Sequence, residues 1–114
     1  MKHVYIAGPF RAKLPWLVEL NVRAAEEAAL HVAEAGAVPV APHCMYRNFN
    51  GTVSDQFWLE ATLSLLMRCD AVMLIDGWRS SSGSLSEKAW AEGHNVPVFE
   101  SLGALQGWLD ERRG

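Results

Sequence analysis

The sequence has few cysteines and contains no long apolar run and no basic run. Cys44 and Cys69 are the only cysteines and lie far apart without a C-x-x-C motif, so we expect two reduced, buried thiols. No apolar run approaches the ~20 residues that a membrane span needs, and the N-terminus lacks the layout of a signal peptide. The net charge of −3 argues against binding to a nucleic-acid polymer or a membrane surface. The sequence therefore predicts a cytoplasmic protein whose ligand is a small molecule.

Several well-known functional motifs are also missing. There is no G-x-G-x-x-G dinucleotide fingerprint, no Walker loop, no G-x-S-x-G nucleophile elbow and no H-E-x-x-H zinc motif. These absences argue against the enzyme classes that the motifs mark. No spacing of cysteine, histidine or acidic residues resembles a metal site. We therefore expect neither a metal nor another cofactor.

The residues that are present predict one α/β domain spanning 1–114. Half of the 114 residues are hydrophobic, which is enough for a core without disulfides or metals. Short β-rich runs alternate with stretches of helical periodicity. Strands are expected at 3–7, 37–41, 70–75 and 96–99. Helices are expected from Pro15 until Gly36 and at 55–67, 84–94 and 102–112, with a loop at 43–54.

This alternation predicts a flavodoxin-like or Rossmann-like three-layer sandwich, with about four parallel strands and helices on both faces. Pro39 removes a hydrogen-bond donor from the second strand, which favours a place at the sheet edge and the strand order 2-1-3-4. In open sheets of this kind, ligands bind beyond the carboxyl ends of the strands, where the strand order reverses. The loops after the first and third strands are therefore the expected site.

The first of these loops is formed by Gly8, Pro9, Phe10 and Arg11. Arg11 could hold a phosphate through its forked donors, or it could be a solvated surface charge. His43 follows the second strand and could donate or accept a hydrogen bond in the same crevice, or be a satisfied loop histidine.

The loop after the third strand runs from Asp76, Gly77 and Trp78 to Ser82, Gly83 and Ser84. Serines and a glycine at a helix start could cradle an anion or a sugar, but Ser84 to Glu87 also matches a capping box, which needs no ligand.

Four further side chains carry open alternatives. Glu87 is expected in the first helical turn, where the helix dipole would keep it ionised and suited to act as a nucleophile; the alternative is a purely structural role. Asp76 is the candidate second carboxylate, or a turn-forming residue. Trp58 and Trp78 could stack on a base, or pack in the core or a dimer contact.

Residues 5–11, 69–78 and 82–87 together resemble the nucleoside 2-deoxyribosyltransferases and the related 2′-deoxynucleoside 5′-phosphate N-hydrolases. The resemblance implies that Glu87 attacks the anomeric carbon and forms a glycosyl-enzyme ester. It implies that Arg11 contacts a 5′-phosphate and that His43 lies near the site. It also implies contacts to sugar or phosphate from Gly8, Ser82, Gly83 and Ser84.

The sequence departs from that family in its acids. The family commonly carries an aspartate on the helix before the central strand, where this chain has Glu60 and Thr62. The transferases carry acids just before the catalytic turn, where this chain has Ser81 and Ser82.

We therefore expect N-glycosidic cleavage or base exchange on a deoxynucleoside or its 5′-monophosphate. The alternatives are a non-catalytic nucleotide-binding module of the same fold and an interaction protein whose tryptophans build a homomeric interface. A homodimer is expected, with helix 55–67 as a contact face.

Overall fold

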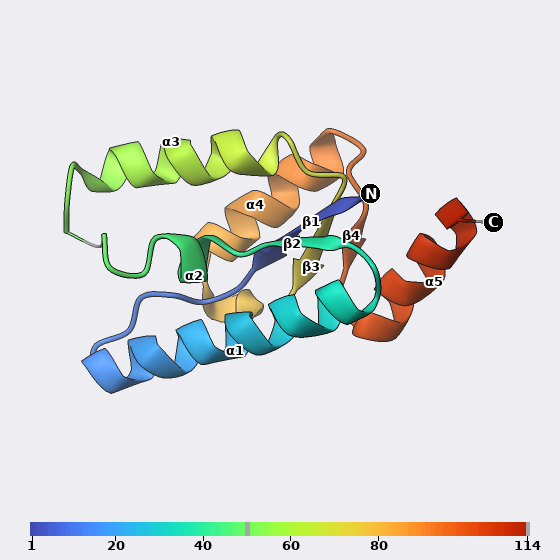
Figure 1. Ribbon diagram of the computed structural model, residues 1–114. Helices are drawn as coiled ribbons and strands as arrows, with labels where there is room; N and C mark the ends of the chain where they lie inside the picture. Colours follow the sequence, from blue (N-terminus) through green and yellow to red (C-terminus); the bar gives the residue numbers. More distant parts are fainter. Residues whose placement is uncertain (50, 114) are drawn as a thin grey trace.

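The computed structural model describes residues 1–49 and 51–113, and it contains one parallel sheet with the strand order β2-β1-β3-β4. This order confirms the predicted α/β fold, and helices cover both faces of the sheet (Figure 1). The strands are β1 (His3–Ala7), β2 (Val38–Val40), β3 (Ala71–Leu74) and β4 (Val98–Phe99). The helices are α1 (Pro15–Glu34), α2 (Pro42–Met45), α3 (Asp55–Leu66), α4 (Ser82–Gly93) and α5 (Leu102–Arg113), with a 3₁₀ turn at Trp78–Ser80.

The alternation of side chains along β1 builds two separate core layers. Val4 and Ile6 point to one face and pack with buried residues of α1 and α5. Tyr5 and Ala7 point to the other face and pack with buried residues of α3 and α4. Figure 1 shows α1 on one side of the sheet and α3 on the other. The strand period thus places the hydroxyl of Tyr5 on the α3 and α4 side.

Proline and glycine set the boundaries that the sequence predicts well. Pro15 occupies the first turn of α1, and Gly36 follows that helix with a left-handed φ of 92°. Pro39 is on β2, an edge strand of the sheet, and lies opposite Val4 of β1. The predicted edge position of this strand is therefore confirmed. A proline is tolerated there because its missing N–H does not remove a hydrogen bond between central strands.

The start of α4 differs from the prediction. The helix begins at Ser82 instead of Ser84, and its N-cap is Ser81, whose hydroxyl oxygen accepts a hydrogen bond from the Ser84 N–H at 3.2 Å. The capping box predicted from Ser84 to Glu87 is therefore wrong. Glu87 lies in the second turn of α4, one turn further from the partial positive charge of the helix start than expected.

Part of the predicted loop at 43–54 is also helical, because Pro42 begins the single turn of α2. Among residues 1–49 and 51–113, no helix is both long and apolar enough to cross a bilayer.

Candidate functional site

A cavity of about 910 Å³ opens beyond the carboxyl ends of β1 and β3, at the edge of the sheet where the sequence predicts the site. Its walls are the turn after β1, the segment from α2 to Phe49, one side of α3 and the first turns of α4. A volume of this size accommodates a ligand of nucleotide dimensions. The cavity brings Gly8, Pro9, Phe10, Arg11 and His43 together with Ser82, Gly83, Ser84 and Glu87.

Gly8 allows the turn after β1 to pack closely against the end of β3. A Cβ atom at position 8 would lie 2.3 Å from Cγ1 of Ile75, which is far inside van der Waals contact. No side chain larger than hydrogen fits there without movement of Ile75. The glycine therefore fixes the distance between the two strand ends that frame the cavity.

Tyr5 and Glu87 form the chemical centre of the cavity. The Tyr5 hydroxyl donates a hydrogen bond to Oε2 of Glu87, which joins the middle of β1 to the second turn of α4. Tyr5 is 2 % exposed, and its pKa is raised by burial and by the neighbouring carboxylate, so it remains a hydrogen-bond donor at neutral pH. Thr62 of α3 also lies close to the Tyr5 hydroxyl and opposes this shift in its pKa.

Burial dominates the protonation of Glu87. It raises the pKa of Glu87 to about 7, although the hydrogen bond from Tyr5 favours the charged form and opposes the rise. The expectation that the helix dipole keeps this carboxylate ionised is therefore wrong, because the side chain lies in the second turn and is mostly buried. Near neutral pH, Glu87 is divided between its acid and its carboxylate form.

Sequence reasoning did not single out Tyr5. The available signal was its position inside an apolar strand, because a buried tyrosine usually finds a partner for its hydroxyl. Its partner is 82 residues away along the chain, so no local motif contains both residues.

His43 holds the turn after β1 in place. Its Nε2 lies 2.9 Å from the carbonyl oxygen of Gly8 and 3.1 Å from that of Pro9, so this nitrogen carries the hydrogen and donates it. Burial lowers the pKa of His43, which favours the neutral ring. Its Nδ1 is then an acceptor, and it is buried without a hydrogen-bond partner in the described part of the chain. The rings of Phe10 and His43 pack in an edge-to-face arrangement, with centroids 5.4 Å apart.

Arg11 and Asp55 close one side of the cavity mouth. A guanidinium nitrogen of Arg11 lies 3.1 Å from Oδ1 of Asp55, which joins the turn after β1 to the start of α3. Both side chains are more than 60 % exposed, so water screens the pair and its contribution to stability is small, about 0 to 1 kcal/mol. Arg11 can therefore change partner at low cost when an anion enters.

The serine segment presents backbone and hydroxyl groups to the cavity in different ways. Ser84 is buried, and its hydroxyl donates to the Ser81 hydroxyl at 3.0 Å, so it completes the helix cap. Ser82 and Gly83 are exposed and supply the first free N–H groups of α4. The anion-binding capacity of the segment thus comes mainly from positions 82 and 83.

Three predicted site residues do not line the cavity. Gly77 has a left-handed φ of 90° and turns the chain away from the end of β3. Trp78 then packs against the core layer on the α3 and α4 side of the sheet, and the Arg79 guanidinium lies 4.5 Å from the centroid of its ring. Asp76 is exposed outside the cavity, so it does not supply the second carboxylate expected there.

An aromatic wall, which we define as Tyr46, Phe49 and Trp58, lines the side of the cavity towards α3. The Trp58 ring centroid lies 5.2 Å from that of Tyr46 and 5.8 Å from that of Phe49. The Trp58 indole N–H donates to the Thr52 carbonyl at 2.8 Å, which fixes the ring. Only Trp58 was singled out from the sequence; the available signal for the others was the density of aromatic residues between positions 46 and 58.

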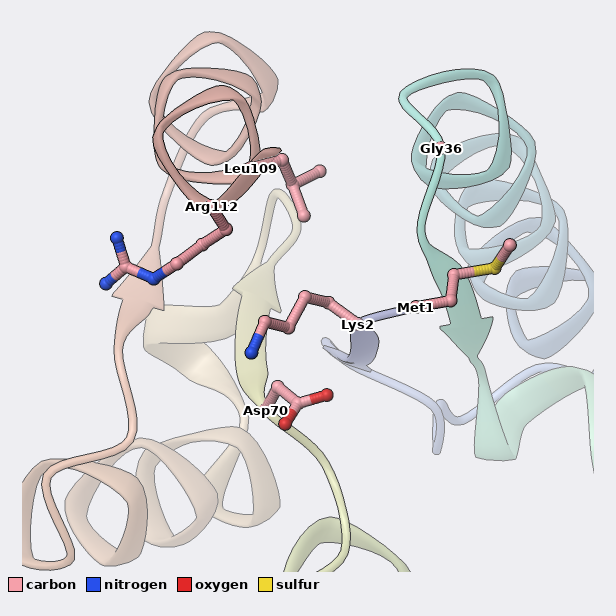
Figure 2. Close-up of a pocket in the computed structure, with 6 residues that line it drawn as sticks. All are labelled: Met1, Lys2, Gly36, Asp70, Leu109 and Arg112. Atoms are coloured by element: carbon pink, nitrogen blue, oxygen red, sulfur yellow. The ribbon is translucent and has the colours of Figure 1, made fainter. Parts of the chain in front are cut away.

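A second, smaller hollow of about 310 Å³ lies at the opposite, amino end of the sheet (Figure 2). Lys2 and Asp70 precede β1 and β3 and lie next to one another there, with Arg112 of α5 nearby. Asp70 accepts a hydrogen bond from the His3 backbone N–H at 2.8 Å, so it also has a structural role. None of the predicted site residues lines this hollow. Within 1–49 and 51–113, no group of three or more histidine, cysteine or acidic side chains is arranged to hold a metal ion.

Comparison with known families adds to this geometry. Residues 2–101 match a family model described as "Domain of unknown function (DUF7768)". The chain belongs to the DUF7768 family. A search of curated protein sequences finds no match to this DUF7768 member.

A solved structure with a similar fold is a 2-deoxyribosyltransferase from the psychrotolerant bacterium Bacillus psychrosaccharolyticus. It has a TM-score of 0.66 and 15 % sequence identity, and the match covers 91 % of this chain and 90 % of that one. At this identity the likeness shows that the DUF7768 chain has a nucleoside 2-deoxyribosyltransferase-like fold.

Proposed function

We propose that this protein cleaves or exchanges the N-glycosidic bond of a deoxynucleoside or its 5′-monophosphate, with Glu87 as the nucleophile. The observation that carries the proposal is the hydrogen bond from Tyr5 to Glu87 inside a cavity that also contains the Gly8–Pro9 turn. A mostly buried carboxylate that is held by one oxygen, beside a space large enough for a nucleotide, is suited to attack an electrophilic carbon. The fold shared with a 2-deoxyribosyltransferase supports the same reaction class.

The reaction would proceed in two displacements. In the first, the ionised Glu87 carboxylate bonds to the anomeric carbon, the C–N bond breaks, and its electron pair leaves with the base, which takes a proton from solvent. In the second, water or another base attacks the same carbon and gives a proton to solvent, and the ester bond to Glu87 breaks to restore the carboxylate. Tyr5 holds Oε2, which leaves Oε1 free to attack.

A 5′-phosphate would find two sources of hydrogen bonds at the cavity rim. The free N–H groups at positions 82 and 83 lie at the positive end of α4, which favours an anion. Arg11 could add a forked, charge-assisted contact by turning from Asp55. These groups favour a phosphorylated substrate over a free nucleoside.

Base release from deoxynucleoside monophosphates, followed by chromatography, tests the proposal. Glu87→Ala should lower the rate by about 10³-fold or more, because the nucleophile is lost. Glu92→Ala is the matched control, since Glu92 is an exposed residue of the same helix that does not line the cavity. Release at the parental rate by Glu87→Ala would show that the assignment is wrong.

A non-catalytic nucleotide-binding role is the second candidate. The acidic residues of the cavity favour this role. Apart from Glu87, the described lining contains one carboxylic acid, Asp55, and its carboxylate is paired with Arg11. A nucleotide that raises the melting temperature without being cleaved would support this role.

We also propose that two copies associate through α3. Leu59 of α3 and Met67, its C-cap residue, are 57 % and 58 % exposed, and Phe57 of α3 is also exposed, which is unusual for large apolar side chains so close together. Leu59 lines the cavity as well, so a partner at this face would help to enclose the ligand. Sedimentation should give a dimer for the parent and a monomer for Leu59→Glu.

A further inference from the structure

The charges that face the cavity favour a positively charged ligand group. Its described lining contains two carboxylates, Glu87 and Asp55, and one permanent cation, Arg11, which is paired with Asp55 at 3.1 Å. His43 adds no charge near neutral pH, because burial lowers its pKa and favours the neutral ring. With Glu87 ionised for attack, the balance of these side chains is one negative charge.

The aromatic wall lines the same cavity as the reacting carboxylate. Trp58 and Thr62 are one turn apart on the same side of α3, and Thr62 lies close to the Tyr5 hydroxyl that holds Glu87. A heterocycle displaced by Glu87 would therefore leave next to Trp58 and its neighbours Tyr46 and Phe49. Aromatic faces attract cations through their quadrupole.

The described lining of this region lacks an unpaired second carboxylic acid that could protonate a leaving base. Thr62 is not an acid, and the carboxylate of Asp55, one turn before Trp58 on α3, is paired with the Arg11 guanidinium at 3.1 Å. Asp76 is outside the cavity. The described lining of the cavity thus holds a carboxylate nucleophile without an unpaired second carboxyl group to act as its general acid.

We propose that the substrates are N-glycosides whose heterocycle already carries a positive charge, such as N7-alkylated purine or N-linked pyridinium deoxynucleosides and their 5′-monophosphates. The inference rests on the proposed function and specifies its substrate class.

The charge on the heterocycle removes the need for an acid. When Glu87 bonds to the anomeric carbon, the electron pair of the breaking C–N bond returns to the ring nitrogen and cancels the positive charge. The heterocycle leaves as a neutral molecule without taking a proton. Water then attacks the anomeric carbon, the ester bond to Glu87 breaks, and the water releases one proton to solvent as the free sugar forms.

The test compares N7-methyl-2′-deoxyguanosine with 2′-deoxyguanosine, each as the nucleoside and as the 5′-monophosphate. Free base is measured with the parent protein and with Glu87→Gln, and the uncatalysed release is subtracted. We expect kcat/KM to be at least about 100-fold higher for the methylated compounds. An enzyme with a general acid would compress this difference, because protonation contributes about 10² to 10⁴ to the rate for the neutral base.

The outcomes separate the two proposals. A ratio of kcat/KM between methylated and unmethylated compounds below about 100 would mean that the site itself supplies a proton. If release still depends on Glu87, this result would overturn the cationic substrate class and leave the proposed glycosidic activity intact. No catalysed release from any of the four compounds, or equal release by Glu87→Gln, would overturn the proposed function and the inference with it.

A binding measurement tests the aromatic wall independently of turnover. In the Glu87→Gln background, Trp58→Leu should weaken binding of the methylated monophosphate by about twofold to thirtyfold, the range of a cation–π contact, and leave the unmethylated compound unchanged. Trp58→Phe, which keeps an aromatic face, should restore most of the loss. Equal weakening for both ligands would mean that Trp58 only shapes the wall, and would contradict recognition of a cation.

Discussion

Removal of the Tyr5 hydroxyl is the sharpest perturbation of the site. Tyr5→Phe deletes one oxygen and keeps the aromatic ring, which packs with buried residues of α3 and α4. Because Tyr5 donates to Oε2 of Glu87, the variant removes the hydrogen bond that favours the charged carboxylate. The pKa of Glu87 should therefore rise further above its present value.

The size of this rise follows from the strength of the lost bond. A hydrogen bond to a charged group contributes about 1.5 to 3 kcal/mol, and each pKa unit corresponds to about 1.4 kcal/mol. From a pKa of about 7 in the parent, the Glu87 carboxyl should move up by about 1 to 2 in Tyr5→Phe. The carboxylate then becomes a minority form at neutral pH.

Carbon NMR of glutamate labelled at its carboxyl group measures this shift directly. The Glu87 signal, assigned with Glu87→Gln, is followed from pH 4 to pH 10 in the parent and in Tyr5→Phe. Tyr46→Phe is the matched control, because it also removes a phenol oxygen from the cavity wall while Glu87 keeps its partner Tyr5. Base release should follow the same titration, rising with pH as Glu87 ionises, with the midpoint moved upward in Tyr5→Phe alone.

An unchanged Glu87 titration in Tyr5→Phe would refute this reasoning, since the hydrogen bond would then contribute nothing to the charged form. An equal rise in Tyr46→Phe would also refute it, because the effect would belong to the cavity in general.

Three other substitutions test neighbouring parts of the account. Glu87→Gln should stabilise the protein above pH 7 by up to about 3 kcal/mol. The pKa of the Glu87 carboxyl rises from 4.5 to about 7 on folding, so the folded state binds this proton more tightly than the unfolded state. The stability of the parent protein therefore falls as the pH rises from 4.5 to about 7. Urea unfolding at pH 5 and pH 8 measures this, and an equal gain at both pH values would contradict it. Gly8→Ala should lower the free energy of unfolding by about 1 to 3 kcal/mol in the same assay, because the new Cβ would meet Ile75. Combination with Ile75→Val should recover part of this loss. An unchanged stability would mean that the turn is not tightly packed. Arg11→Gln should raise the KM for a monophosphate by about tenfold or more and leave the KM for the nucleoside unchanged, and equal effects on both would argue against a phosphate contact.

The sheet and its order were predictable because they depend on local rules that agree with one another. Pro39 could only be tolerated at an edge, and Gly36 could end the first helix with a left-handed φ. The helical crossovers then left few topologies. The cavity at the carboxyl ends of β1 and β3 follows from this order without any knowledge of side-chain contacts.

The details of the site were less predictable, for three physical reasons. Several adjacent serines can each cap a helix, and local spacing does not distinguish the true cap, Ser81, from Ser84. The chain turns after β3 at Gly77 with a left-handed φ, and Asp76, just before this turn, lies outside the cavity. The pKa of Glu87 depends on burial by elements distant in sequence, which outweighs the helix dipole.

The central claim is that the Glu87 carboxylate forms a covalent bond to the anomeric carbon of a sugar. The most direct measurement is mass spectrometry of the protein after incubation with a 2′-deoxy-2′-fluoroarabinosyl nucleotide, whose fluorine slows hydrolysis of the ester. The account predicts an added mass equal to the fluorinated sugar phosphate on the peptide that contains Glu87, and no added mass in Glu87→Gln. An adduct on a different residue, or release of base by the parent and by Glu87→Gln at equal rates, would contradict it.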